Sequence, residues 1–227
     1  MEITIGHLYY DLMNLYGESG NIKVLTYQLE KQNIKVNVKK LSIKDEINFD
    51  ELDLIYIGSG TLNNQKLVLN DILKYKDDIY KYYNNNKFFL ITGNAIELFG
   101  KYIIDINNKK YNCLGLFDYY TKENKKRIVN EVYKQSKFVK DNILGFNNHY
   151  GSIYDSEDNI LDDKGIFNNN FYGTYTLGLL PRNPLFTKYF IKKIILEKNK
   201  KFKFKDFNFK LDKKAYLNFI AFKNNIK

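Results

Sequence analysis

The stretch FFLITGNAIELFGK, residues 88–101, indicates how this chain is built. Its first five residues predict a buried strand, which ends where Gly93 and Asn94 interrupt the pattern. The residues that follow predict a short helix. A strand, a tight turn and a helix in this order form the elbow on which many α/β enzymes present a nucleophile. Gly93 lies at the apex of this elbow and has no side chain that could react.

The segments before the elbow alternate between strand and helix patterns. Strands are predicted at 2–6, 34–41 and 52–58, and helices at about 17–33 and 65–82. This alternation predicts an α/β fold, a mostly parallel, doubly wound sheet with flanking helices, whose chemistry lies at the carboxyl ends of the strands. The turns GSGT (58–61) and TGNA (92–95) are therefore expected to face each other at one edge of the sheet.

After the elbow the pattern changes to hairpins. Residues 101–120 contain an Asn-Asn-Lys-Lys turn between two apolar runs, and KRIVNEVY (126–133) and NILGFNNHYGSI (142–153) are typical of strands, so some antiparallel hairpin strands are expected. FYGTYTLG (171–178) predicts one more strand. Asn183 and Pro184 are then expected to cap a helix that ends at about Glu197.

The segment from Asn199 onward alternates lysine with phenylalanine before a final apolar stretch. We expect it to form a solvated strand and a last helix. A membrane-surface or ligand role for the Lys-Phe run is the weaker alternative.

Composition favours a folded, soluble protein of the cytoplasm. The 227 residues are 44% hydrophobic, enough for a buried core, and no apolar run is long enough for a membrane span. The N-terminus MEITIGHLYY lacks the basic start and apolar core of a secretory signal. The single cysteine, Cys113, lies in an apolar run and is expected to be a core residue. With only two histidines in addition, no metal site is predicted.

The formal charge of +10 raises the question of nucleic-acid binding. The chain is rich in Lys, Asn, Ile and Tyr and has no Trp, which is the composition expected of a coding sequence rich in A and T. Only two arginines are present, Arg127 and Arg182, whereas arginine makes most bidentate contacts to phosphates and bases. The sequence therefore disfavours nucleic acid as a partner.

Single motifs identify no reaction. GSGT could begin a dinucleotide fingerprint, but the third glycine would fall on Asn63, so the match fails. The role that remains for this turn is to present backbone amides, as an oxyanion hole does. Thr92 ends its strand without an apparent base beside it. His149, in GFNNHYG, is expected to be an ordinary loop histidine that could bind a ligand. The chain carries no P-loop, and no cofactor is predicted.

Several motifs in one order do resemble a known family. The stretches LYYDLMNLYGESGNI (8–22), IGSGTLNNQ (57–65), LGLFDYYTKENKKR (114–127), LGFNNHYGSIY (144–154) and GTYTLGLLPRNP (173–184) are similar to motifs of the glutamine amidotransferase subunits of lipid II isoglutaminyl synthase. These subunits are related to the amidotransferase domains of cobyric acid synthase. The resemblance implies a class I glutamine amidotransferase-like domain at 1–197, followed by a Lys/Phe-rich C-terminal extension at 198–227 that packs on the domain or trails from it.

The same resemblance implies that the amide-hydrolysing pair is missing. The family's nucleophile motif, C-G-G-[YF]-Q-x-L-G-K, laid without gaps on GNAIELFGK (93–101), places Gly93 at the cysteine, and Leu177 falls where the family has its histidine. Glu97 replaces a glutamine beside the elbow, whereas Arg127 matches a family arginine implicated in substrate binding. No catalytic residue is then intact. The substrate-binding residues implied are Arg127, Gly58, Gly60, Asn94, Glu97 and His149.

The resemblance also implies a partner and a pathway. Subunits of that family pair with a Mur-ligase-like, ATP-dependent subunit (MurT type), which amidates D-glutamate in the peptidoglycan stem peptide with ammonia released from glutamine. We therefore expect an amidotransferase-like subunit of such a heterodimer whose own glutaminase activity is lost, with either glutamine or free ammonia as the nitrogen source. The alternative is a non-catalytic scaffold or ligand sensor.

Overall fold

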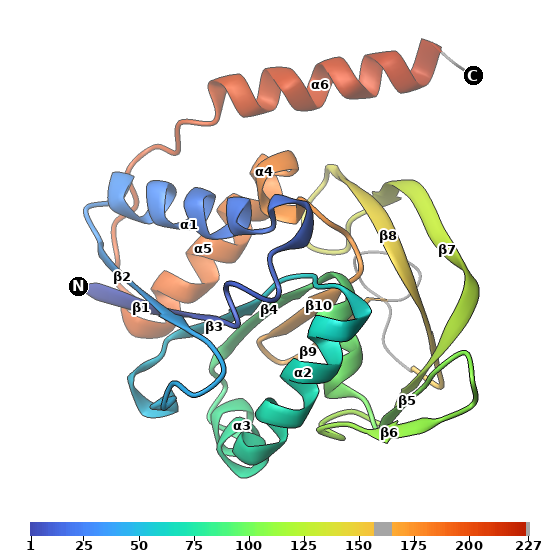
Figure 1. The fold of residues 1–227 in the computed structure, drawn as a ribbon. Helices are drawn as coiled ribbons and strands as arrows, with labels where there is room; N and C mark the ends of the chain where they lie inside the picture. The colour runs from blue at the N-terminus through green and yellow to red at the C-terminus, as the bar shows by residue number, and fades with distance from the viewer. Residues whose placement is uncertain (157–164, 226–227) are drawn as a thin grey trace.

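The computed structural model describes residues 1–156 and 165–225, and its centre is a six-stranded sheet (Figure 1). The strand order is β2-β1-β3-β4-β10-β9, and neighbouring strands run parallel except for the antiparallel pair of β9 and β10. The predicted mostly parallel α/β fold is thereby confirmed. The strands are β1 (Glu2–Leu8), β2 (Lys35–Leu41), β3 (Leu54–Ile57), β4 (Phe88–Thr92), β9 (Ile166–Asn168) and β10 (Phe171–Thr174).

The central strands β3 and β4 are buried on both faces, as their continuous apolar runs predict. Successive side chains alternate between the faces, so that Leu54 and Tyr56 join one core while Ile55 and Ile57 join the other. Helices α1 (Ser19–Lys31) and α5 (Pro184–Lys198) cover the first of these cores, and α2 (Leu62–Ile72) and α3 (Lys76–Asn84) cover the second (Figure 1).

Two local expectations for helices were wrong. The single helix expected at 65–82 is divided into α2 and α3 by the 3-10 turn η3 (Leu73–Tyr75). Asn183 does precede α5, but its side chain does not cap that helix. Its Oδ1 accepts a hydrogen bond from the Leu144 amide at 2.7 Å and its Nδ2 donates to the Leu144 carbonyl at 2.7 Å. Asn183 therefore ties the start of α5 to strand β8 (Asn142–Tyr154).

A second, four-stranded sheet lies beside the carboxyl end of the central sheet (Figure 1). Its order is β6-β5-β7-β8, built from β5 (Tyr102–Ile104), β6 (Lys110–Asn112), β7 (Tyr120–Gln135) and β8 (Asn142–Tyr154). The predicted hairpins are confirmed, because β5 pairs with β6 and β7 with β8 in antiparallel fashion. The pairing of β7 and β8 shifts register between Glu123 and Ile128, and Arg127 lies in this bulge.

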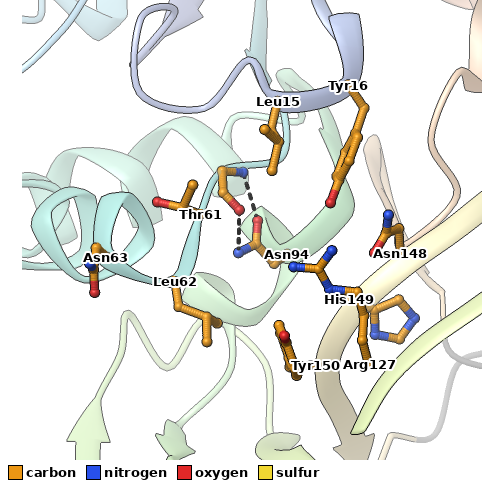
Figure 2. Close-up of a pocket in the computed structure, with 11 residues that line it drawn as sticks. Leu15, Tyr16, Thr61, Leu62, Asn63, Asn94, Arg127, Asn148, His149 and Tyr150 are labelled. Atoms are coloured by element: carbon orange, nitrogen blue, oxygen red, sulfur yellow. Dashed lines mark hydrogen bonds between the residues drawn. The ribbon is translucent and has the colours of Figure 1, made fainter.

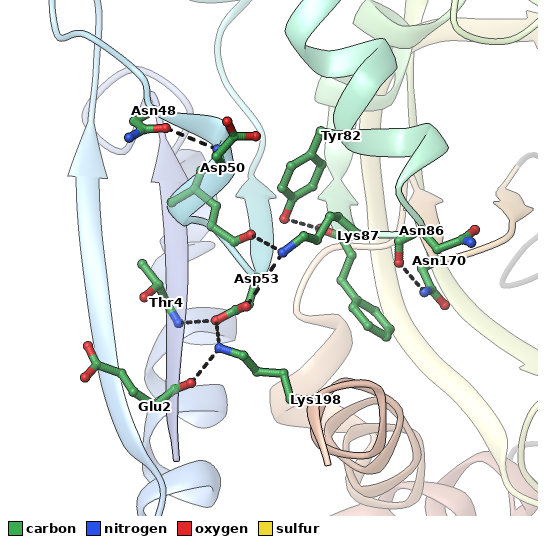
Figure 3. Close-up of polar contacts among 12 residues, drawn as sticks. Glu2, Thr4, Asn48, Asp50, Asp53, Tyr82, Asn86, Lys87, Asn170 and Lys198 are labelled. Atoms are coloured by element: carbon green, nitrogen blue, oxygen red, sulfur yellow. Dashed lines mark hydrogen bonds and ion pairs between the residues drawn. The ribbon is translucent and has the colours of Figure 1, made fainter. Parts of the chain in front are cut away.

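The amino end of the central sheet is held by one carboxylate, that of Asp53 (Figure 3). It accepts a hydrogen bond from the Thr4 amide at 2.8 Å and pairs with the Nζ atoms of Lys198 at 2.7 Å and Lys87 at 3.9 Å. Lys198, the last residue of α5, also donates to the Glu2 carbonyl at 2.8 Å. This cluster fixes α5 to β1 and β3 far from the elbow.

The expected strand after Asn199 is absent from residues 200–209, whereas the expected final helix is present as α6 (Lys210–Asn225). Phe202, Phe204 and Phe207 pack against the core covered by α1 and α5. The backbone of this segment bonds instead to Gln32, whose side chain accepts from the Lys205 amide at 2.8 Å. The expected division of the chain at residue 197 stays a prediction. No helix within the described residues is long and apolar enough to cross a bilayer.

Candidate functional site

The elbow is formed by the end of β4 and the turn that follows it. The expected short helix is a 3-10 helix, η4 (Gly93–Phe99), all of whose residues are buried. Gly93 has φ of 63°, in the left-handed region where a Cβ is strained, so glycine suits the apex. The chain reverses there without any reactive side chain.

Asn94 joins the elbow to the turn between β3 and α2. Its Oδ1 accepts from the Gly60 amide at 2.9 Å and its Nδ2 donates to the Gly60 carbonyl at 3.1 Å (Figure 2). The Oδ1 also accepts from the Ser59 hydroxyl at 3.2 Å. The prediction that the turns at 58–61 and 92–95 face each other is confirmed. Because the Gly60 amide already donates its hydrogen bond to Asn94, it has a partner within the protein.

Ser59 fills the space directly beside Gly93. A Cβ placed on Gly93 would lie 2.3 Å from the Ser59 Cβ and 2.5 Å from its hydroxyl oxygen. Contacts this short do not occur between real side chains, so Ser59 has to move before residue 93 can carry any side chain. Ser59 itself is only 2% exposed.

Glu18, a buried residue that the sequence did not single out, links the elbow to the region of Leu177. Its carboxylate accepts from the Thr92 hydroxyl, which precedes Gly93, and from the Gly178 amide at 3.0 Å, which follows Leu177. Burial raises the pKa of this carboxyl above its ordinary value. Leu177 is 5% exposed and its amide donates to the Phe146 carbonyl at 2.9 Å. The only signal for Glu18 was its place in the motif YGESGN.

Glu97 is buried behind the elbow. Its two oxygens accept hydrogen bonds from Gln65 Nε2 at 2.8 Å and from the Tyr175 hydroxyl at 2.9 Å. Burial raises the pKa of Glu97 to about 7, because only neutral groups compensate its charge. Gln65 also donates to the Asn94 carbonyl at 2.7 Å, so this buried network connects Glu97 to the backbone of the elbow.

A cavity of about 240 Å³ opens in front of the elbow (Figure 2). Arg127 enters it from the bulge of β7, with its guanidinium 4.9 Å from the centre of the Tyr150 ring. Asn148 of β8 also lines the cavity, while its side-chain oxygen is buried and has no hydrogen-bond partner. The cavity thus presents a cation to a ligand. This suits a small ligand that carries an anionic group.

The structure brings together four of the six predicted substrate-binding residues. Gly60, Asn94, Arg127 and His149 line the cavity, whereas Gly58 and Glu97 are not part of its lining. Their binding roles stay predictions.

The expectation of a loop position for His149 was wrong. His149 lies within β8, is 7% exposed and stacks on the Tyr175 ring with 3.7 Å between ring centres. Its Nδ1 is 2.7 Å from the Gly151 carbonyl oxygen. Burial lowers the pKa of His149 to about 4, so its imidazole is neutral at neutral pH. His149 forms a rigid wall of the cavity.

Cys113 is a core residue, as predicted. It is 5% exposed, and burial raises the pKa of its thiol to about 12, which leaves almost no thiolate at neutral pH. Within residues 1–156 and 165–225, no group of three or more His, Cys, Asp and Glu side chains is arranged to hold a metal ion.

The sequence is similar to known proteins over most of its length. Residues 4–184 match the family described as the CobB/CobQ-like glutamine amidotransferase domain. A relative from Staphylococcus aureus (strain N315), lipid II isoglutaminyl synthase (glutamine-hydrolyzing) subunit GatD, is 32% identical over 205 residues, which cover 85% of this chain and 84% of the relative. The subunit of the same name from Streptococcus pneumoniae (strain ATCC BAA-255 / R6) is 29% identical over 69% of this chain and 61% of its own length.

The fold is similar to that of a solved structure described as the crystal structure of glutamine amidotransferase. The TM-score is 0.54, with 83% of this chain and 98% of the other covered at 11% sequence identity. At this identity the likeness concerns the fold alone.

Proposed function

This chain belongs to the CobB/CobQ-like glutamine amidotransferase family, and we propose that it is the amidotransferase-like subunit of a lipid II isoglutaminyl synthase-type complex. The similarity to two subunits named GatD, extending over most of the chain, supports a role in peptidoglycan amidation. The partner in this proposal is a Mur-ligase-like, ATP-dependent subunit that amidates D-glutamate in the stem peptide. The two chains form a heterodimer, in which ATP is used by the partner because this chain has no P-loop.

The second part of the proposal is that this chain no longer hydrolyses glutamine. Amide hydrolysis by this family's chemistry needs a thiolate and a base, and neither Gly93 nor Leu177 supplies one. The observation that supports the loss is the position of Ser59, whose side chain fills the space that a side chain at residue 93 needs. The family motif that IGSGTLNNQ (57–65) resembles is I-G-G-G-x-x-x-x-Q, which has glycine at the position of Ser59. A nucleophile cannot be restored here by changing residue 93 alone.

Reconstitution tests both parts. The chain is co-expressed with the Mur-ligase-like subunit of the same organism, and the purified complex is supplied with ATP, the lipid-linked acceptor and either glutamine or an ammonium salt. We expect amidation with ammonium and none above background with glutamine. Failure of the two chains to co-purify would contradict the partner, and glutamine-dependent amidation would contradict the loss of glutaminase activity.

A matched set of variants tests the role of Ser59. Gly93→Cys with Leu177→His should show no glutaminase activity, whereas adding Ser59→Gly should give weak activity, because only then is there room for the new thiol. Adding Glu97→Gln should improve it, since that change restores the residue of the family pattern. Displacements of about 1 Å cost on the order of a hundredfold in rate, which limits the recovery. Equal activity with and without Ser59→Gly would contradict the role of Ser59.

The cavity favours a second candidate function, a ligand sensor without catalysis. Arg127 offers a cation, the group that the carboxylate of a small amino acid would engage. Titration calorimetry with glutamine and glutamate tests this. We expect binding that Arg127→Ala weakens, while Arg182→Ala serves as the control because Arg182 lies outside the cavity lining. No heat with either compound would contradict the sensor.

A further inference from the structure

The positive charge of the chain is concentrated in its last thirty residues. Residues 198–227 contain ten lysines and two aspartates, a net charge of +8 out of the total of +10. Residues 1–197 are therefore close to neutral, at +2. A composition drift that enriched lysine evenly would not produce this asymmetry. The C-terminal extension is accordingly a separate electrostatic feature, and it lies beyond residue 184, where the family match ends.

The first part of the extension is fixed to the body and directs its lysines outward. Phe202, Phe204 and Phe207 pack on the core, and Lys188 and Lys192 of α5 lie over two of these rings at 5.5 and 5.0 Å. The lysines before and between these aromatic residues are exposed; they are Lys201, Lys203 and Lys205. Aromatic burial on one side therefore forces a row of charges to the surface on the other.

Helix α6 is attached by one side. Tyr216 is buried and its hydroxyl donates to the Asn142 carbonyl at 3.0 Å, while Lys223 pairs with Glu131 of β7. Figure 1 shows the helix lying along the outside of the molecule, beyond α1 and the short helix α4 (Leu179–Arg182). These contacts define which side of α6 stays free.

The free side carries large apolar residues beside lysines. Leu211 is 80% exposed, Phe222 is 59% exposed, and with Ala215 and Asn218 they follow the spacing of four, three and four residues that makes one stripe on a helix. Leu217 is also 53% exposed. Three exposed lysines lie in the same helix. Lys214 adjoins the stripe, because it is three residues from Leu211 and four from Asn218, whereas Lys210 and Lys213 lie farther around the helix.

We propose that the C-terminal extension docks on the surface of an anionic lipid membrane. The lysines contact the headgroups, and α6 lies in the plane of the interface with Leu211 and Phe222 directed toward the acyl chains. A basic helix with exposed Leu and Phe is the pattern of interfacial helices, and lysine-rich segments bind anionic lipids through their charge. Exposed apolar side chains add nothing to binding a nucleic-acid backbone, whereas a lipid surface uses both features. This inference is independent of the proposed function.

Vesicle flotation with the full chain tests the charge. We expect association with vesicles that contain phosphatidylglycerol, little with pure phosphatidylcholine, and release by salt because the Debye length shortens. Lys210→Gln, Lys213→Gln and Lys214→Gln together should weaken association on the order of a hundredfold, from about fivefold per lysine. The control removes three exposed lysines elsewhere, Lys109, Lys125 and Lys126, and should change association by less than about twofold.

The apolar stripe is tested without any change in charge. Leu211→Ser with Phe222→Ser should weaken vesicle association by about tenfold, because two exposed apolar side chains no longer enter the interface. The chain has no tryptophan, so Phe222→Trp provides a single reporter whose emission should shift to the blue on anionic vesicles. Circular dichroism checks that the variants fold.

Three outcomes would overturn the proposal. The first is no association with anionic vesicles, and the second is an equal loss for the α6 triple variant and its control. The third is vesicle association that the serine substitutions do not weaken, together with no blue shift in the emission of the Phe222→Trp variant and with equally strong binding to RNA. That last result would mean a general affinity for polyanions.

Discussion

The two ends of the central sheet hold buried carboxylates in opposite ways. At the amino end, Asp53 pairs with two lysines and a backbone amide, so its negative charge is compensated. At the carboxyl end, Glu18 and Glu97 accept hydrogen bonds from neutral groups only, and burial raises the pKa of both. Ionisation of the latter two opposes folding. The amino end is thus built for stability, whereas the candidate site keeps groups that cost stability.

The largest effect should come from removing the uncompensated charge of Glu97. Its pKa is raised from 4.5 to about 7, so the stability that its protonated form contributes is complete below pH 4.5 and is lost as the pH rises through about 7. Glu97→Gln removes this loss. We expect the free energy of unfolding of the variant, relative to the parent, to increase by about 3 kcal/mol between the two pH values. Urea denaturation at each pH measures this difference.

A constant difference between the two proteins at both pH values would contradict the comparison. It would mean that burial does not raise the pKa of Glu97 in the folded protein.

At the amino end, removing a buried carboxylate should lower the free energy of unfolding instead of raising it. Asp53→Ala removes the partner of Lys198 and Lys87 and should lower the free energy of unfolding by about 2 kcal/mol. The value stays below that of a fully buried pair because both lysine side chains are more than a third exposed and can be hydrated.

Asp50 provides the matched control in the same region (Figure 3). It pairs with Lys81 at 3.1 Å, but both side chains are more than 60% exposed, so Asp50→Ala should cost less than about 0.5 kcal/mol. Equal costs for the two substitutions in urea denaturation would show that Asp53 is no more than a surface ion pair.

The sequence predicted what depends on local pattern. The apolar runs of β3 and β4 and the glycines that end them are sufficient for a parallel sheet with two facing turns, because parallel strands end at one edge. Helix 65–82 was predicted as continuous because no proline or glycine marks the break at Leu73–Tyr75. The Phe-rich segment alternates like a strand, yet its aromatic residues pack on α5 and its backbone has no neighbouring strand.

The parts of the site that the sequence missed depend on residues far apart in the chain. Glu18 gains its role from partners at Thr92 and Gly178, and neither is near it in sequence. His149 is buried because β8 pairs with β7 and because Tyr175 stacks on its ring. The sequence indicated Ser59 only as part of the turn GSGT (58–61), and it is the folded chain that places it against Gly93. Resemblance identified the positions, and packing decided which of them are accessible.

At the carboxyl end, Ser59 and Gly93 should show a coupling that neither residue shows alone, because Ser59 occupies the space that a side chain at residue 93 would need. Gly93→Ala brings two penalties: a Cβ at φ of 63°, and the approach of that Cβ to Ser59 at 2.3 Å. Gly17→Ala isolates the first penalty, because Gly17 has φ of 74° and no atom within 4 Å of a built Cβ.

A double-mutant cycle separates the second penalty. Ser59→Gly removes the obstructing side chain, together with one hydrogen bond to Asn94. In that background Gly93→Ala should cost close to what Gly17→Ala costs, because the one close approach left is that to the Cα of residue 59 at 3.0 Å. We expect a coupling free energy of about 1 kcal/mol between positions 59 and 93, measured by urea denaturation of the four proteins. No coupling would mean that the backbone at Ser59 shifts without cost. The space beside the elbow would then be available to a side chain. In that case the chain would lack a nucleophile only because residue 93 is glycine, and not because Ser59 fills the site.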